Sequence, residues 1–357
     1  NGRLGKELWT DQGHGEPIRV FKGYSDGEET SFVIDTVKAA MSDGVPLDEI
    51  AILYRSNAQS RMFEHGLFNA RIPYRVYGGL RFFERAEIKH AMAYLRLINN
   101  PEDDNAFLRV VNFPARGIGA KSIENLQQVA QGTGVTLWQA ACSGGAGGRA
   151  AVAMAQFIGV IEGMRIATKG QALPEIVRHL LDASTLKAHY AAEKDGQDRV
   201  ENLEELINAA DNFLRETGGV VHVENLDGTM SESDDPVTAF LSHASLEAGD
   251  TQAAEGRAAL QMMTVHSAKG LEFEYVFMTG LEEGLFPHDN SLNDDGGLEE
   301  ERRLMYVAIT RAKKRLHFSY EQMRMLHGQT RYNVPSRFLD EVPAELLKWL
   351  SAKPKNL

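Results

Sequence analysis

Residues 260–265 read Leu260-Gln261-Met262-Met263-Thr264-Val265, and this stretch decides how the whole chain is organised. It is a short, mostly apolar run of the length expected for a buried strand. It follows a long helical region and restores an alternation of strands and helices that also opens the chain. The simplest account is one α/β domain with a parallel sheet, interrupted by a helical insertion.

Strands and helices alternate on both sides of the insertion. Before it, the pattern predicts strands at residues 18–21, 51–54 and 73–77, and helices at residues 26–43, 57–69 and 85–99. After it, the pattern predicts strands at residues 260–265, 275–279 and 315–320, and a helix at residues 298–309. Helices between successive strands are typical of a parallel sheet covered on both faces.

Strand signals vanish between about residue 100 and residue 255, where helical stripes replace them. A glycine-rich joint at residues 143–148 and an acidic loop at residues 224–235, expected to be mobile, interrupt these stripes. We predict an all-helical domain here. The predicted boundaries are residues 1–97 for the first part of the α/β domain, 98–255 for the helical domain, 256–345 for the second part of the α/β domain, and 346–357 for a C-terminal tail.

Composition excludes several classes of protein. A single cysteine, Cys142, rules out a disulfide framework and a zinc cluster built on cysteines, so no metal site is predicted on this chain. No run of about 18 apolar residues or leader segment is visible, so we expect no membrane span and a cytoplasmic, bacterial location. The formal net charge of -12 argues against a surface coated for nucleic acid. Any DNA binding must use local basic patches.

Two blocks of sequence carry the chemistry. The first runs from Met263 to Phe273 after the predicted strand, and the second runs from Glu299 to Ala312 on a predicted helix. Helical spacing places Arg311 on one stripe at the helix end, and an arginine fork in such a place suits the stabilisation of charge on a transferring phosphate. The alternative is that the neighbouring arginines of the second block pair with the preceding glutamates on a solvated helix.

Further blocks extend the pattern along the chain: Leu53–Arg61, Tyr77–Lys89, Gly284–Pro287, Pro335–Leu339 and Leu8–Thr10. Together with the first two blocks, they resemble the UvrD/Rep/PcrA helicases of superfamily 1, in the right order over essentially the whole chain. The sequence departs from that family at His90, where the family usually has Asp. The lost carboxylate could weaken a helix contact or change pH sensitivity.

The resemblance implies a RecA-like domain, called 2A, interrupted by a helical domain, called 2B. It also implies a role for each motif residue. Arg55 and Arg311 would be the catalytic residues, reaching the γ-phosphate of ATP, with Tyr54 on the adenine and Gly270 and Glu272 at the nucleotide. His266, Thr264 and Ser267 would contact single-stranded DNA. From the residues alone, Tyr54 could be an aromatic residue at the edge of the sheet, and His266 could be an interior histidine with hydrogen-bonded ring nitrogens. Lys269-Gly270 could be a simple turn.

No phosphate-binding P-loop occurs in the sequence, and no acidic pair follows an apolar strand in the way that magnesium binding needs. Arg116-Gly117-Ile118-Gly119-Ala120-Lys121-Ser122 lacks the required upstream glycine. This segment fits a phosphate-backbone contact better, through Gly117, Gly119, Lys121 and Ser122 at a helix start. It resembles the duplex-contacting Gly-Ile-Gly turn of the family. The alternative is a tight turn between two helices.

The resemblance implies the C-terminal half of an ATP-dependent 3′-to-5′ DNA helicase that acts in DNA repair. ATP with Mg²⁺ would bind against a P-loop domain of the same protein, and this chain alone is expected to be inactive. Partners would be single-stranded and duplex DNA and proteins of excision or mismatch repair. Phe82 or Phe83 would either stack on bases or pack in the core. Two other classes stay open, namely a non-catalytic DNA-binding or regulatory module and the helicase part of a helicase–nuclease.

Overall fold

The computed structural model describes residues 13, 15–145, 148–194, 196–218, 221–224, 230–233, 235–249, 258–326 and 329–351. The chain divides into two compact units. Unit 1 comprises residues 1–79, 253–324 and 332–357, and unit 2 comprises residues 80–252 and 325–331. The block Leu8–Thr10 lies outside the described residues.

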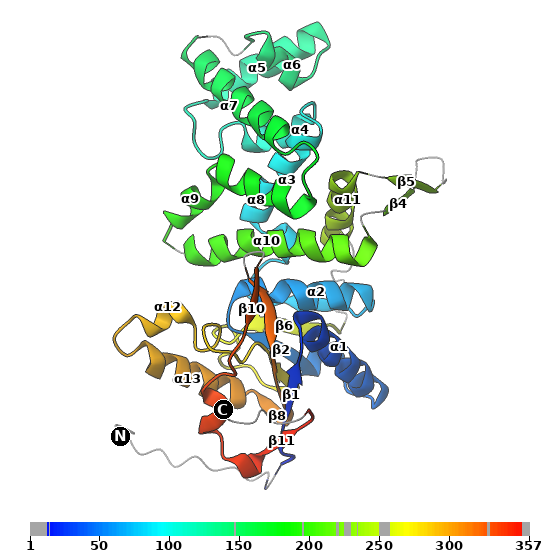
Figure 1. The fold of residues 1–357 in the computed structure, drawn as a ribbon, viewed down its shortest axis with the longest axis vertical. Coiled ribbons are helices and arrows are strands. Elements are labelled where there is room, and N and C mark those ends of the chain that lie inside the picture. Colours follow the sequence, from blue (N-terminus) through cyan, green and yellow to red (C-terminus); the bar gives the residue numbers. More distant parts are fainter. Residues whose placement is uncertain are drawn as a thin grey trace. The chain divides into compact units, whose positions relative to one another are not determined.

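Unit 1 is built on a seven-stranded sheet in which every pairing is parallel (Figure 1). The strand order is β11-β1-β8-β7-β2-β6-β3. The strands are β1 (Ile18–Gly23), β2 (Ile50–Tyr54), β3 (Tyr74–Val76), β6 (Leu260–Thr264), β7 (Phe273–Met278), β8 (Ala312–Glu321) and β11 (Leu347–Trp349). The expected parallel α/β fold is therefore present.

Strand β2 shows why these residues form a central strand. All five of its residues are buried, as expected for a strand covered on both faces of a parallel sheet. Successive side chains point to opposite faces, so Ala51 and Leu53 belong to one apolar core while Ile50 and Ile52 belong to the other. Each fully buried Leu or Ile side chain stabilises the fold by about 1.5–3 kcal/mol.

Helices cover the two faces of the sheet. Helices α1 (Asp26–Ser42) and α2 (Ser60–Asn69) pack on the face of Ile50 and Ile52 through their buried apolar residues. Helix α13 (Gly297–Ile309) covers the opposite face with Leu304, Met305 and Ala308. Because α13 connects β7 to the parallel strand β8, its first turn lies toward the carboxyl ends of the strands and its last turn toward their amino ends.

Unit 2 is mainly helical and has one continuous apolar core. Its helices are α3 (Ala86–Asn99), α4 (Asp104–Val110), α5 (Ala120–Thr133), α6 (Leu137–Cys142), α7 (Gly148–Ala167), α8 (Leu173–Ala183), α9 (Leu186–Ala191), α10 (Gly196–Thr217) and α11 (Pro236–Gly249). The apolar stripe of α10 is buried as the helical spacing predicts, with Leu203 and Leu206 fully inaccessible.

The structure differs from the sequence expectations in three places. Unit 2 is not all-helical, because β4 (Val221–Glu224) and β5 (Met230–Ser233) form an antiparallel pair where a loop was expected. The expected tail contains β11, which pairs with β1 at the edge of the sheet. Unit 2 begins at Leu80 rather than at residue 98, because α3 packs in the helical core.

Helix α7 is the one described helix that is long and apolar enough, by length and composition, to cross a membrane. Its residues Met154, Phe157, Ile161 and Met164 are nonetheless buried in the core of unit 2. Their spacing places them on one face of the helix. One face of this helix is therefore packed in the core of unit 2.

Candidate functional site

The carboxyl ends of β2 and β6 bring two distant motif blocks together. Tyr54 ends β2 and is in register with Thr264, which ends the neighbouring strand β6. The backbone N–H of Val265 donates to the carbonyl of Tyr54 at 2.9 Å. Loops at the carboxyl ends of parallel strands are where α/β proteins bind ligands, so Arg55 and the loop that begins at Val265 share one such edge.

Arg55 is held in a fork by Glu301 of α13. Its Nε and Nη2 atoms donate to both carboxylate oxygens at 2.7–3.1 Å. The side chain of Glu301 is only 2% exposed, whereas that of Arg55 is 17% exposed. Ser291 donates to the same carboxylate at 2.8 Å, and the His288 N–H does so at 3.2 Å.

Glu301 is a functional candidate that the sequence interpretation missed. Its burial raises the pKa of the carboxyl, but the hydrogen bonds and charge of Arg55, with Ser291 and the His288 N–H, outweigh burial and hold the pKa below its usual value. The carboxylate therefore stays ionised and fixes the direction of the Arg55 guanidinium. Glu301 directly precedes two arginines in the sequence, which suggested a local ion pair on the surface. Its partner in the structure is Arg55, which lies 246 residues away in the sequence.

Arg311 has different partners. Helix α13 ends at Ile309, so Arg311 lies beyond the helix rather than on its stripe, and that part of the expectation was wrong. Its guanidinium donates to the backbone carbonyls of Val307 at 3.0 Å and Leu271 at 2.7 Å, and to the Thr310 hydroxyl at 2.9 Å. Neutral oxygen acceptors thus hold this arginine.

The structure does not bring the two arginines into one cluster. Arg55 contacts Glu301 near the start of α13, and Arg311 follows the end of the same helix. Glu301 and Ile309, the last residue of α13, are eight residues apart, which corresponds to about 12 Å along the helix axis, and Arg311 follows beyond that end. Glu272 lies at the Arg311 end, because the N–H of the next residue, Phe273, donates to the Arg311 carbonyl at 2.9 Å.

Three aromatic residues expected at ligand contacts are buried. Tyr54 is 0% exposed and packs in the core on the α1 and α2 face, so its ring offers no surface to an adenine in this structure. Period-two alternation explains this, because Tyr54 and Arg55 point to opposite faces. Phe82 and Phe83 are 1% and 6% exposed, so core packing is the alternative that the structure supports for both.

The loop at residues 265–272 joins the two ends of the site on the face covered by α13. Val265 and Ala268 anchor it in the core. The hydroxyls of Thr264 and Ser267 lie 3.1 Å apart. His266, Lys269, Gly270 and Glu272 are exposed, so His266 is not an interior histidine. Gly270 has a φ of +89°, a left-handed conformation that glycine adopts without strain.

The other arginines of α13 form surface pairs. Arg303 donates to Glu300 at 2.8 Å, and both side chains are more than half exposed. Arg302 pairs with Glu299 and, at 2.7 Å, with Glu341. The alternative interpretation, pairing with the preceding glutamates on a solvated helix, is confirmed for these two residues.

The Gly-Ile-Gly turn precedes α5 in unit 2. Gly117 has a φ of +79°, while Ile118 is 1% exposed and anchors the turn in the helical core. The Asn112 side-chain oxygen accepts from the N–H of Arg116 and the N–H of Ile118, at 2.9 and 3.1 Å. A Cβ at Gly117 or Gly119 would meet no atom within 4 Å, so the outer side of the turn is open. Lys121 is exposed there, and Ser122 is half-buried.

A second buried charge cluster lies at the same edge of the sheet. Arg324 donates to Glu282 with Nε and Nη2, each at 3.1 Å, and contacts Glu29 at 3.1 Å and Glu321. The three glutamates are at most 1% exposed. Burial, reinforced by the other carboxylates and opposed by Arg324, holds the pKa of Glu321 well above its usual value.

Comparison with known proteins shows which protein family this chain is similar to. Residues 1–143 and 160–323 match the model of the UvrD-like helicase C-terminal domain. The chain is 46% identical to DNA helicase II of Escherichia coli K12 over 98% of its own length and 48% of that protein. It is 38% identical to the ATP-dependent DNA helicase PcrA of Bacillus subtilis over 100% of its length and 48% of that protein. The chain therefore spans about half the length of these curated relatives.

Proposed function

Because the chain belongs to the UvrD-like helicase C-terminal family, we propose that it is the second half of an ATP-dependent DNA helicase. Relatives that are similar over nearly the whole chain carry the names DNA helicase II and ATP-dependent DNA helicase PcrA. The proposed activity of the intact protein is 3′-to-5′ translocation on single-stranded DNA with separation of the duplex in DNA repair. In this proposal unit 1 is domain 2A and unit 2 is domain 2B.

One observation carries the proposal furthest: a parallel sheet presents a preorganised arginine, Arg55, at its carboxyl edge. The carboxylate of Glu301 holds that guanidinium as a fork, and a fork of two N–H groups matches a phosphate as well as it matches a carboxylate. In phosphoryl transfer, such an arginine stabilises the negative charge that builds on the transferring group.

Arg55 and Arg311 are the proposed catalytic residues. Both are held by partners of this chain, so engaging one γ-phosphate requires the two guanidiniums to turn toward each other from the two ends of α13. Closure of a cleft against a P-loop domain would provide the anion that draws them together. The nucleotide contacts at Gly270 and Glu272 belong to the Arg311 end. Tyr54 would have to leave its buried position before it could stack on adenine.

The proposed DNA contacts come from two surfaces. The exposed His266, with Thr264 and Ser267 beside it, would touch single-stranded DNA. The Gly117–Gly119 turn with Lys121 and Ser122 would approach the duplex backbone, because an open glycine turn at a helix start lets phosphates come close to backbone N–H groups. Binding through phosphates weakens as salt concentration rises.

ATP with Mg²⁺ is the proposed substrate, and the remaining parts of its site would come from elsewhere in the protein. Since this sequence holds no P-loop, the phosphate cradle and the magnesium ligands would lie on a P-loop domain. The arginines supplied here fit the negative charge of a triphosphate. Proteins of excision or mismatch repair are proposed partners.

The proposal is tested by ATP hydrolysis stimulated by single-stranded DNA. The full-length protein is expected to hydrolyse ATP only when DNA is present, and residues 1–357 alone are expected to be inactive. Adding a P-loop half from a close relative is expected to restore DNA-dependent turnover. Hydrolysis by residues 1–357 alone would show a complete nucleotide site on this chain and would end the proposal.

A further inference from the structure

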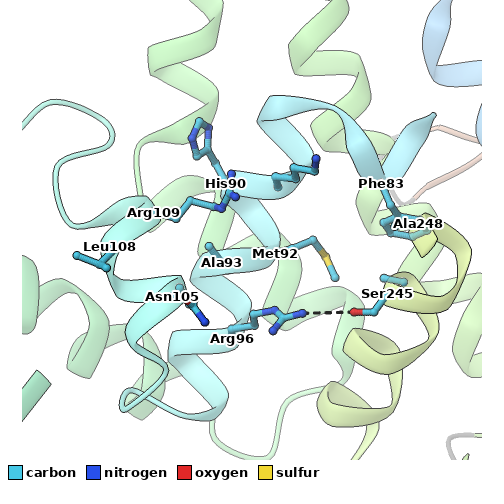
Figure 2. Close-up of a pocket in the computed structure, with 13 residues that line it drawn as sticks. Phe83, His90, Met92, Ala93, Arg96, Asn105, Leu108, Arg109, Ser245 and Ala248 are labelled. Atoms are coloured by element: carbon cyan, nitrogen blue, oxygen red, sulfur yellow. Dashed lines mark hydrogen bonds between the residues drawn. The ribbon is translucent and has the colours of Figure 1, made fainter. Parts of the chain in front are cut away.

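Unit 2 contains a pocket of about 730 Å³ between helices α3, α4 and α11 (Figure 2). Helix α3 contributes Lys89, Met92 and Arg96, and α4 contributes Leu108 and Arg109. Lys89, Met92 and Arg96 recur at three- and four-residue intervals, so they share one face of α3. Figure 2 shows Arg96 and Arg109 on either side of Met92 and Ala93.

The pocket is positively charged in a chain that is strongly acidic. The sequence has 50 acidic and 38 basic residues, yet none of the lining residues is Asp or Glu. Arg96 is paired with Asp103 at 3.6 Å and donates to Ser245 at 3.3 Å. Lys89 and Arg109 form no ion pair with any residue that the structure describes. Arg109 is therefore available to an anionic group from outside, whereas the Lys89 charge also acts on Glu84, whose pKa it helps to lower.

His90 lies in the wall of the pocket but does not add to its charge. Burial first, and then the nearby side chains of Arg109, His189 and Arg199, lower its pKa to about 4. Its Nδ1 lies 2.7 Å from the Tyr190 hydroxyl oxygen, within hydrogen-bond distance. The imidazole also stacks on Phe113 with ring centroids 3.8 Å apart. His90 is thus a structural residue of the wall.

Apolar side chains form the rest of the surface. Ala93 and Phe83 are nearly buried, Met92 is half-buried, and Leu108 is 37% exposed at the rim. Methionine adapts its shape to different partners, and apolar groups of this kind gain free energy only when other apolar groups cover them. The pocket therefore combines a hydrophobic centre with a basic rim.

We propose that this pocket is a docking groove for an acidic amphipathic segment of another protein. Leucine-like side chains of the segment pack on Met92 and Leu108, while its carboxylates meet Lys89, Arg96 and Arg109. Charge complementarity identifies the occupant's acidic character, and the apolar centre identifies its amphipathic character. A DNA duplex fits less well, because it presents a convex row of phosphates and would leave Met92 and Leu108 uncovered.

The test uses the full-length protein and a fluorescently labelled helical peptide with glutamates along one face and leucines along the other. Anisotropy is expected to show saturable binding that weakens at least about tenfold in Arg109→Glu, equivalent to about 1.4 kcal/mol. Leu108→Asp is expected to have a similar effect. Arg215→Glu is the matched control, because Arg215 is an exposed arginine on α10 of the same unit. That variant is expected to bind normally.

Three results would overturn the proposal. The first is equal binding by the wild type, Arg109→Glu and Leu108→Asp. The second is equal binding of a peptide in which glutamines replace the glutamates. The third is a duplex oligonucleotide that displaces the peptide and is itself weakened by Arg109→Glu, since the groove would then be a DNA surface. Far-UV circular dichroism checks that each variant is folded, and Arg109→Ala replaces Arg109→Glu if the latter is not.

Discussion

Arg55 and Arg324 are two largely buried arginines at the carboxyl edge of one sheet, and they differ in the number of carboxylates around them. Arg55 faces a single carboxylate, that of Glu301, within the described part of the chain. Arg324 faces three, those of Glu29, Glu282 and Glu321. The pKa of Glu301 is lowered, whereas the pKa of Glu321 is raised.

The difference bears on the proposed role of Arg55. The Arg55 pair is balanced in charge, and in the proposed function an incoming phosphate would replace or share Glu301. The Arg324 cluster has three carboxyl groups for one guanidinium, and this excess disfavours a further anion and retains the arginine. Charge balance therefore distinguishes a proposed catalytic arginine from a structural one of similar burial.

The largest expected effect concerns the catalytic assignment. Arg55→Ala or Arg311→Ala in the full-length protein is expected to reduce ATP turnover about 10³-fold, because each change removes a cation from the transferring phosphate. DNA binding is expected to stay largely intact. Turnover stimulated by single-stranded DNA is the measurement. A rate near that of the wild type in either variant would remove that arginine from the catalytic assignment.

Replacing Arg324 is expected to affect stability instead of chemistry. Arg324→Ala leaves three buried carboxylates without a cation and is expected to lower the free energy of unfolding by about 3–5 kcal/mol. Arg324→Lys keeps the charge and is expected to lose less. Urea denaturation measures both. A loss below about 1 kcal/mol in Arg324→Ala would mean that the carboxylates do not depend on this arginine.

Glu321→Gln tests the excess charge directly. The pKa of Glu321 is higher in the folded protein than its usual value of 4.5, so its stabilising contribution is full at low pH and declines as the pH rises above 4.5. A glutamine is neutral at every pH, so the variant is expected to be more stable than the wild type near pH 8, by about 1 kcal/mol. Thermal unfolding at several pH values provides the measurement.

Glu282→Gln is the matched comparison for that prediction. Burial raises the pKa of Glu282 too, but Glu282 accepts hydrogen bonds from Arg324 with both carboxylate oxygens. Its replacement is expected to destabilise the protein near pH 8, because it weakens those hydrogen bonds. If the Glu282 and Glu321 variants lose equal stability, the excess charge is not concentrated at Glu321.

The smallest effect is expected at the surface of α13. Arg303→Ala removes an exposed pair with Glu300 and is expected to change the free energy of unfolding by less than about 0.5 kcal/mol. ATP turnover is expected to stay unchanged. A large loss of turnover would mean that the catalytic region extends along α13 to Arg303, so that Arg303 and Arg55 would no longer differ in their effect on turnover.

Much of the fold follows from local pattern. The buried runs of β2 and β6 and the apolar face of α13 all predicted their elements, because burial fixes the period of apolar residues. Strand β11 was not predicted, because its three edge residues are half-exposed or exposed and show no apolar pattern long enough to indicate a strand. The β4–β5 pair escaped because it lies in a stretch whose acidic, glycine-containing composition is typical of loops.

The site was less predictable than the fold. Motif resemblance selected Arg55 and Arg311, but sequence spacing cannot show that they lie at opposite ends of α13. Glu301 could have been identified only from the fold, as the buried carboxylate that contacts Arg55. The burial of Tyr54 was accessible in principle, because alternation along β2 places it opposite Arg55.

The three glutamates that share Arg324 also have a calorimetric consequence. Over the pH range in which Glu321 is protonated only in the folded state, folding takes up a proton from the buffer. The heat of unfolding then contains the ionisation enthalpy of that buffer. Two buffers with different ionisation enthalpies would give different heats of unfolding at the same pH. The slope of the heat of unfolding against the ionisation enthalpy of the buffer would give the number of protons released on unfolding.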